Sequence, residues 1–373
     1  MVFQHTRLNA FAAAVALAAG GSSSMFASGL GVYNCADLAP YTTGDAMTRD
    51  VSVFLEDGVD VTCEEVTTVY VKGSYKFTVH SDNHSVGFTG LRFEITEGAE
   101  FSMSLAVGDF VSTATFTGVT SQASNGGVFH VDGDSSATFG NAMVFDDNSV
   151  VSPYHGGAVY AGGLVDFQYG TTTFNGNEVL SGPDFNNGGG GAVAVAESGK
   201  VIFQDFAYFN ANKVLGGGRG GAMENLGDAY FNRASYFMAN VASEDGDGTG
   251  GKGGAVFTGE GSTTTFHRRT IHHDNRADNG GGALWNEGTT TLMSSGFLKG
   301  NSANGGDAAD GGHIWTSGAV TAGGFVNLRD GTANRDGGAV FIATGGSLDV
   351  AGVVTVERNS AGESCDDVFP CTR

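Results

Sequence analysis

A Gly-Gly-small-aliphatic element that recurs about every thirty residues is the strongest constraint on how this chain of 373 residues folds. The eight copies begin at Gly126, Gly156, Gly190, Gly220, Gly253, Gly281, Gly311 and Gly337. A second element, an aromatic or aliphatic residue three places before Asn, follows six of them: Phe145…Asn148, Phe174…Asn177, Phe209…Asn212, Phe237…Asn240, Leu298…Asn301 and Val356…Asn359. Two ordered elements at one period indicate a repeat architecture.

The segments between the two elements are short and β-like, for example Val201-Ile202-Phe203. Each repeat offers two or three such strands separated by turns, and no helical periodicity is present. Helical arrays therefore do not fit, and propeller blades repeat at about 40–45 residues. The pattern predicts an all-β solenoid with capped ends, in which one repeat of about 30 residues forms one coil of a parallel β-helix.

A parallel β-helix places like residues on like residues, because each strand pairs with its equivalent about 4.8 Å away in the next coil. The repeated Phe is then expected to form an interior aromatic column. The repeated Asn is expected to form an amide ladder, and the Gly pair permits a positive φ at a sharp corner.

Composition supports an ordered β-rich chain. There are 62 Gly and only 4 Pro, yet 40% of the residues are hydrophobic and 27 are Phe. This excludes a disordered linker, a collagen triple helix and a helical bundle. The formal net charge of −22 makes a nucleic-acid partner improbable, since affinity for phosphate comes from Lys and Arg.

Residues 1–27 have the pattern of a secretory signal peptide. Arg7 precedes an apolar run at 11–19, and small residues follow the run. The alternative is a buried N-terminal helix. The run is too short to span a membrane, and no other apolar stretch of about 18 residues is present. We expect a secreted or extracellular protein, associated with a cell surface or wall or free of it, with no membrane span in the mature chain.

The rest of the chain divides into three parts. Residues 28–120 lack the Gly-Gly element but remain β-rich, which predicts an N-terminal cap and irregular first coils; a separate small β-sandwich is the alternative. Residues 121–362 form the regular repeats, and residues 363–373 form a C-terminal disulfide cap.

Four cysteines and one glycosylation sequon fit an extracellular location. Pairing within each end of the chain, Cys35 with Cys63 and Cys365 with Cys371, is the favoured one of three possible connectivities. Asn83 begins the sequon Asn-His-Ser.

The succession of GGA-[ILV] and F-x-x-N resembles the polymorphic outer membrane protein repeats of chlamydiae, over residues 121–362. The resemblance implies a right-handed parallel β-helix of the pectin-lyase-like kind and a surface or adhesive role. The sequence ends at Arg373 without the membrane barrel of that family. We therefore do not expect the family's mode of surface anchoring.

The densest basic cluster, residues 266–278, is the candidate for chemistry. His272 or His273 would act as a general base oriented by Asp274, while Arg268 and Arg269 grip a uronate. Metal binding by the two histidines and the aspartate is a second interpretation, although neighbouring strand residues point to opposite faces. The third is a solvated strand and turn in which His272 replaces the Phe of F-x-x-N.

The acidic insertion near residue 245 is a weak candidate for Ca²⁺. Asp245 and Asp247 could contribute carboxylate oxygens, and the alternative is a solvated loop. No other cofactor is expected.

A strong structural repeat without a converging set of polar residues favours binding over catalysis. We expect a secreted, non-catalytic β-helix for extracellular binding, adhesion or cell-wall and surface structure. Its partner would be an extracellular glycan or a cell-surface protein. The alternative is a carbohydrate-active enzyme, a polysaccharide lyase, epimerase or glycoside hydrolase.

Overall fold

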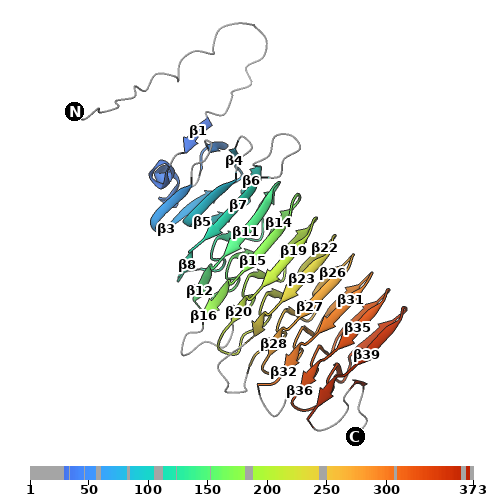
Figure 1. Ribbon diagram of the computed structural model, residues 1–373. Helices are drawn as coiled ribbons and strands as arrows, with labels where there is room; N and C mark the ends of the chain where they lie inside the picture. The colour runs from blue at the N-terminus through green and yellow to red at the C-terminus, as the bar shows by residue number, and fades with distance from the viewer. Residues whose placement is uncertain are drawn as a thin grey trace, which may run out of the picture.

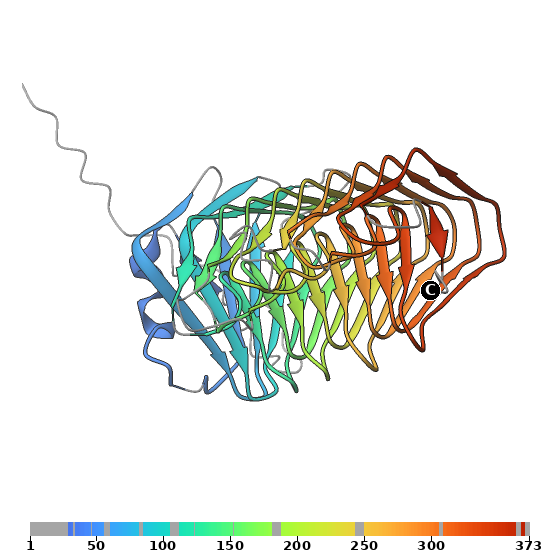
Figure 2. The same cartoon turned by 90° about the horizontal axis from the view of Figure 1, so that it is seen from below.

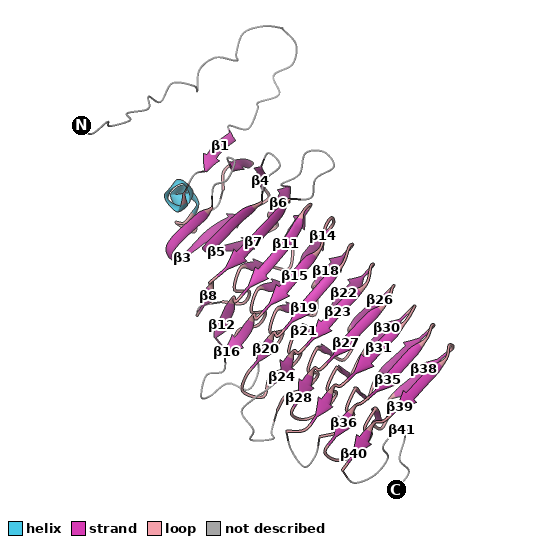
Figure 3. Ribbon diagram, in the orientation of Figure 1, coloured by secondary structure: helices cyan, strands magenta, loops and turns pink. Residues whose placement is uncertain are grey.

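The computed structural model shows an elongated stack of parallel β-coils that runs from one end of the molecule to the other (Figures 1 and 2). It describes residues 29–362 and 367–369, except 33, 46, 56–59, 82–84, 105–111, 123, 152, 181–187, 243–249 and 306–308. The predicted parallel β-helix is confirmed. Almost every described element is a strand (Figure 3).

Each regular coil contains four strands, as one coil illustrates. β13 (Val159–Ala161) is followed by β14 (Leu164–Phe167), β15 (Thr172–Asn175) and β16 (Glu178–Leu180). Each pairs in parallel with the equivalent strand of the next coil, so the coil has four faces, named here the β13, β14, β15 and β16 ladders. The sequence predicted two or three strands per repeat. The additional strand is the β16 type, whose two or three residues are too few for an alternating pattern.

The β14 ladder is a twelve-stranded sheet. It consists of β1 (Gly29–Val32), β2 (Val51–Leu55), β4 (Lys76–Ser81), β6 (Glu100–Ser104), β10 (Ser136–Phe139), β14, β18 (Lys200–Phe203), β22 (Asp228–Phe231), β26 (Thr263–Phe266), β30 (Thr289–Leu292), β34 (Ala319–Ala322) and β38 (Ser347–Val350). The β16 ladder has nine strands: β8 (Thr120–Ser121), β12 (Ser149–Val151), β16, β20 (Lys213–Val214), β24 (Val241–Ala242), β28 (Arg276–Ala277), β32 (Ser302–Ala303), β36 (Thr332–Ala333) and β40 (Ser360–Ala361).

The β13 and β15 ladders are joined into one sheet of twenty strands by β5 (Val86–Thr96). This strand pairs with β7 (Thr113–Thr117), with β9 (Phe129–Val131) and with β3 (Val61–Lys72). The β15 ladder is β7 (Thr113–Thr117), β11 (Ala142–Asp146), β15, β19 (Ala207–Asn210), β23 (Ser235–Met238), β27 (Thr270–His273), β31 (Gly296–Lys299), β35 (Val326–Arg329) and β39 (Val354–Glu357). The β13 ladder is β9 (Phe129–Val131), β13, β17 (Val193–Val195), β21 (Met223–Asn225), β25 (Val256–Thr258), β29 (Leu284–Asn286), β33 (Ile314–Thr316), β37 (Val340–Ile342) and β41 (Val368–Phe369).

The N-terminal strands belong to the same solenoid. β2, β4 and β6 lead directly into β10 of the β14 ladder, so the described part of 28–120 does not form a separate β-sandwich. A short 3₁₀ helix, η1 (Cys35–Tyr41), lies at this end of the stack (Figure 1). The predicted disulfide joins Cys35 to Cys63 of β3, with a Cα–Cα distance of 5.2 Å.

Two columns of phenylalanine fill the interior of the coils. The F-x-x-N phenylalanines stack along the β15 ladder, for example Phe174 on Phe209 with centroids 4.8 Å apart. A second column on the β14 ladder meets the first edge to face, as Phe203 does Phe174 at 88°. Stacking along a column and edge-to-face contact across it are both favoured geometries for aromatic rings. These rings are fully buried and form the core.

The predicted asparagine ladder runs beside the first phenylalanine column. Asn177 Nδ2 donates to Asn212 Oδ1 at 3.0 Å and to the carbonyl of Phe145 at 2.9 Å. The same pattern repeats at Asn148, Asn212 and Asn240. Each amide is buried and pairs with the coils on both sides, so the ladder fixes the register of the stack.

The Gly-Gly corner needs both glycines, for different reasons. Gly156 has a φ of 73°, a left-handed conformation that favours glycine. A Cβ on Gly157 would lie 2.0 Å from the carbonyl oxygen of Gly191 in the next coil, so a side chain has no room there. The corner therefore brings consecutive coils into close backbone contact.

Several predictions fall outside the described residues: the signal peptide at 1–27, the sequon at Asn83, the calcium candidates Asp245 and Asp247, and the pair Cys365 and Cys371. Within the described ranges, no helix has the length and apolar character needed to cross a membrane.

Candidate ligand-binding face

The two adjacent histidines of the predicted site lie on opposite sides of β27. His272 is fully buried and its ring stacks on that of Phe237, with centroids 4.7 Å apart and an interplanar angle of 4°. It thus occupies the phenylalanine position of F-x-x-N, and burial lowers its pKa to about 3. The structure separates His272 from the other candidate residues and places it in the core, where no substrate reaches it.

The remaining candidates are outside the core. His273 points outward, and its Nδ1 lies 3.0 Å from Asp274 Oδ2. Asp274 forms the corner after the strand with a φ of 54°. Arg268 and Arg269 precede β27 and are exposed. Among the described residues, no group of three His, Cys, Asp or Glu side chains is placed to hold a metal ion.

Two basic residues from later coils extend the surface around His273. His273 pairs in register with Lys299 of β31, and Lys299 pairs with Arg329 of β35. All three occupy the first variable position of F-x-x-N or its equivalent. Lys299 and Arg329 were not among the predicted site residues, because they lie about 26 and 56 residues from His273 in the chain. Comparison of that position across repeats would have found them.

A column of outward aromatic residues runs beside the basic column. Tyr208 and Tyr236 stack with centroids 4.6 Å apart and an interplanar angle of 3°. Arg269 Nη2 donates to Tyr236 Oη at 3.1 Å. The pKa of Tyr208 is raised, first by partial burial and then by Tyr236. The column continues through Ile271 to Phe297.

These residues line a hollow on the outside of the β15 ladder. Its volume is about 270 Å³, and it is lined by Arg269, Ile271, His273, Phe297, Leu298, Lys299, Asn327 and Arg329. No carboxylate is among them. We name the surface made by Tyr208, Tyr236, Arg269, His273, Phe297, Lys299 and Arg329 the basic aromatic face. It covers five coils, about 19 Å along the axis at ~4.8 Å per coil.

The charges of the basic aromatic face are only partly neutralised. Arg329 Nε lies 3.3 Å from Asp330 Oδ2. The pKa of Asp330 is lowered mainly by its hydrogen bond with Arg358. Neither Arg269 nor Lys299 has a carboxylate within 4 Å in the described ranges. Arg269 and Lys299 therefore form no close ion pair in these ranges, although Lys299 is near enough to Asp330 to help lower the pKa of that carboxyl. Both cations lie on one face of a chain with a net charge of −22.

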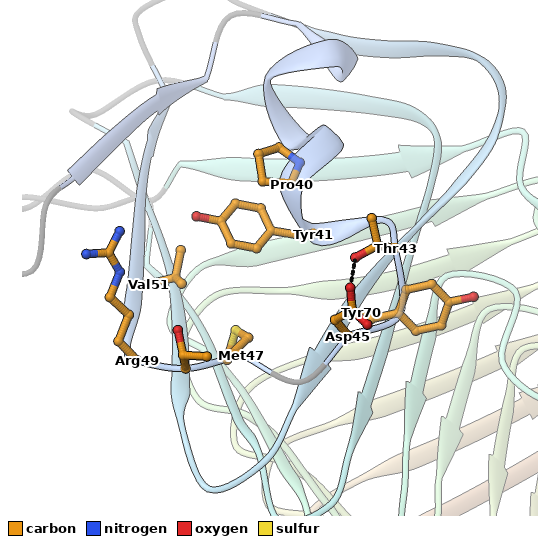
Figure 4. A pocket seen from close by; sticks show the side chains of 9 residues that line it. Pro40, Tyr41, Thr43, Asp45, Met47, Arg49, Val51 and Tyr70 are labelled. Atoms are coloured by element: carbon orange, nitrogen blue, oxygen red, sulfur yellow. Dashed lines mark hydrogen bonds between the residues drawn. The ribbon is translucent and has the colours of Figure 1, made fainter.

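The N-terminal cap has a hollow of its own, of about 280 Å³ (Figure 4). Figure 4 shows Thr43 and Asp45 between the rings of Tyr41 and Tyr70, and the Thr43 hydroxyl donates to Asp45 at 3.0 Å. This hollow is made by η1, the start of β2, the segment between them and β3, outside the repeats. It contains none of the predicted site residues.

Comparison with protein-family models, with curated proteins and with solved structures finds no match to this chain.

Proposed function

We propose that this protein is secreted and binds an anionic extracellular polysaccharide along the basic aromatic face. The observation that carries the proposal is that Arg269 and Lys299, which have no carboxylate within 4 Å among the described residues, lie beside outward aromatic rings in a strongly acidic chain. The apolar segment at 11–19 and the Cys35–Cys63 disulfide support an extracellular location.

The geometry suits a polymer with acidic sugar rings. Arginine presents a planar fork of donors that matches a carboxylate or sulfate group. Tyrosine rings offer flat apolar surface together with a polar tip. Because equivalent positions repeat at every coil, a linear chain lying along the axis meets similar groups several times. Multiple weak contacts of this kind add up to useful affinity.

The test is binding of polygalacturonate, alginate and heparin to the purified protein by isothermal titration calorimetry at several salt concentrations. Replacing both Arg269→Gln and Lys299→Gln is expected to weaken binding at least about tenfold, since hydrogen bonds to charged groups contribute about 1.5–3 kcal/mol each. The matched control is Lys200→Gln, which removes a cation that lies over the Tyr230 ring on the β14 ladder, 4.8 Å from its centroid.

Two results would contradict the proposal. One is binding of acidic polysaccharides that the double variant and the Lys200 control weaken equally. The other is equal binding of polyglutamate, which carries the charge without sugar rings. The same mixtures are assayed for released sugars or unsaturated products, because a carbohydrate-active enzyme is the alternative prediction.

A further inference from the structure

The outward residues of the β13 ladder form a column with one gap. In successive coils the middle residue of each strand is His130, Tyr160, Ala194, Glu224, Phe257, Trp285, Trp315 and Phe341. Only Ala194 is small. The residue before the Gly-Gly pair shows the same break, since that coil has Gly189 where its neighbours have His155 and Arg219. One coil thus has no large side chain at either position.

The gap is a pocket with a volume of about 410 Å³. We name it the notch; it is lined by His155, Tyr160, Ala194, Val195, Ala196, Glu197, Ser198, Glu224 and Leu226. The Tyr160 ring, which stacks on His130 with centroids 5.1 Å apart, comes from one neighbouring coil. Leu226 comes from the other. A largely apolar hollow with a few polar groups is typical of small-ligand sites.

A buried carboxylate organises the polar side of the notch. Glu224 is 1% exposed, and its Oε2 lies 2.6 Å from His155 Nδ1, two coils away. Its Oε1 forms an ion pair with Arg219. A Cβ on Gly189 would lie 2.1 Å from Glu224 Oε2, so the glycine is what lets the carboxylate reach across the intervening coil. Burial of a carboxylate is costly unless it is paired, as it is here.

This arrangement determines which groups can meet a ligand. His155 uses Nδ1 toward Glu224, which leaves Nε2 as the ring nitrogen for a ligand, and its side chain is 24% exposed. The hydroxyl of Tyr160 stays protonated at neutral pH, since burial raises its pKa. Two hydrogen-bonding groups therefore adjoin an aromatic ring face.

The charges of the notch exclude anionic ligands. Glu224 forms an ion pair with Arg219, and the exposed Glu197 adds a negative charge at the rim. An anion would meet Glu197 without an unpaired cation to hold it. Neutral groups that both donate and accept hydrogen bonds, such as sugar hydroxyls, fit His155 and Tyr160, while the apolar walls fit the carbon face of a sugar ring.

We propose that the notch is a second binding site, independent of the basic aromatic face, and that it takes one neutral sugar ring. The ring packs between Tyr160 and Leu226 above Ala194, and its hydroxyls bond to His155 and Tyr160. Glu224 is a positioning residue, because it fixes the orientation of the His155 imidazole from within the fold.

The experiment is a titration of the full chain with the methyl glycosides of glucose, galactose, mannose and N-acetylglucosamine. Binding is detected by ligand-observed NMR. At least one of them is expected to give saturable binding. Ala194→Phe places an aromatic ring at the one small position of the column and fills the notch. It is expected to abolish glycoside binding. Glu224→Gln is expected to weaken it, because the amide no longer offers His155 Nδ1 a carboxylate oxygen on either side, while the folded variant still binds polygalacturonate.

The matched control is Ile202→Phe, an added aromatic ring on the outward side of β18 in the β14 ladder, which should bind sugar like the unchanged protein. Absence of saturable binding by all four glycosides of the unchanged protein overturns the proposal, whether or not the variants fold. Two other results also overturn the proposal. One is sugar binding that survives in the folded Ala194→Phe variant. The other is saturable binding of a charged sugar, galacturonate or glucosamine, without binding of the neutral glycosides. Polygalacturonate titrated into the same variants reports on the basic aromatic face, so failure of one site is distinguished from failure of the other.

Discussion

Gly331 interrupts the asparagine ladder, and His313 fills the space that it leaves. Gly331 stands where the neighbouring coils place Asn301 and Asn359, and His313 replaces the alanine that follows most Gly-Gly pairs. The buried imidazole accepts a hydrogen bond from Asn301 Nδ2 at Nδ1, at 3.0 Å. In the coils from Asn148 to Asn275 an asparagine oxygen accepts that bond. We predict that Gly331→Asn is tolerated much better together with His313→Ala than alone.

The magnitudes follow from the contacts. A Cβ at Gly331 would lie 2.7 Å from His313 Nε2 and 2.4 Å from the carbonyl oxygen of Gly338. Overpacking of this kind costs about 1–3 kcal/mol or more. His313→Ala alone removes a buried ring and a hydrogen bond, at a cost of roughly 3–5 kcal/mol. The double variant removes the ring and returns an amide to the ladder. The cost of the double variant should therefore be about 2–3 kcal/mol smaller than the sum of the two single costs. The close contact between the new Cβ at position 331 and the carbonyl oxygen of Gly338 remains in the double variant.

Hydrogen exchange of the amides in 298–332 measures the local free energy of opening, and thermal unfolding followed by circular dichroism measures the whole chain. Local exchange is the more direct measurement, because solenoid coils interact mainly with their nearest neighbours. Additive costs of the two substitutions, with the double variant less stable than either single one, would refute the reasoning. The control is a double variant in distant coils, Gly331→Asn with Asn148→Ala, whose effects should add.

Two further predictions concern acid stability and the N-terminal cap. Burial lowers the pKa of His313 to about 4 and that of His272 to about 3, so the folded chain keeps both neutral. An unfolded histidine binds a proton near pH 6.5, so stability is complete above that pH and falls as the pH drops toward 4, by about 3 kcal/mol from His313 alone. Acid titration by circular dichroism should show this loss, and His272→Phe should move the unfolding midpoint to lower pH without weakening polysaccharide binding; an unchanged midpoint would argue against a buried neutral His272. Replacing Cys35 and Cys63 by Ser opens a loop closed over 28 residues and should cost about 3.5 kcal/mol in the stability of the cap. Hydrogen exchange should then rise in 35–72 and stay constant beyond 121, whereas a uniform rise would contradict a local role for the disulfide.

The features that repeat were predictable from the sequence. Stacking in a parallel β-helix turns each repeated residue into a column. The Phe174 and Asn177 positions could therefore be assigned to stacked columns from the sequence alone. The β16-type strands could not, because two or three residues hold too little pattern. Their position is set by the pairing of each coil with the next, for example Lys213 with Val241.

The binding surfaces were harder to predict because they combine residues from several coils. The cluster at 266–278 was recognisable because its residues are close together in the sequence. Alternation along the strand nevertheless buries His272 and turns His273 outward. Lys299 and Arg329 reach the same surface through pairing in register. The notch was missed because its signal is the small size of Ala194 and Gly189, which is visible only when the repeats are aligned by position.

Departures from the repeat separate structural adjustments from candidate sites. Inside the solenoid, the exchange at Gly331 is matched by His313 in the neighbouring space, so the core stays filled and the departure has a structural explanation. On the outside, the Glu224 carboxylate fills the space over Gly189, but the small Ala194 has no such match, and a hollow of about 410 Å³ remains. A hollow contributes no packing, and the buried Glu224 that crosses it adds a desolvation cost that its ion pairs only offset. Stability alone would favour an aromatic residue there, as at Phe257, so the open notch is better explained by a ligand than by folding.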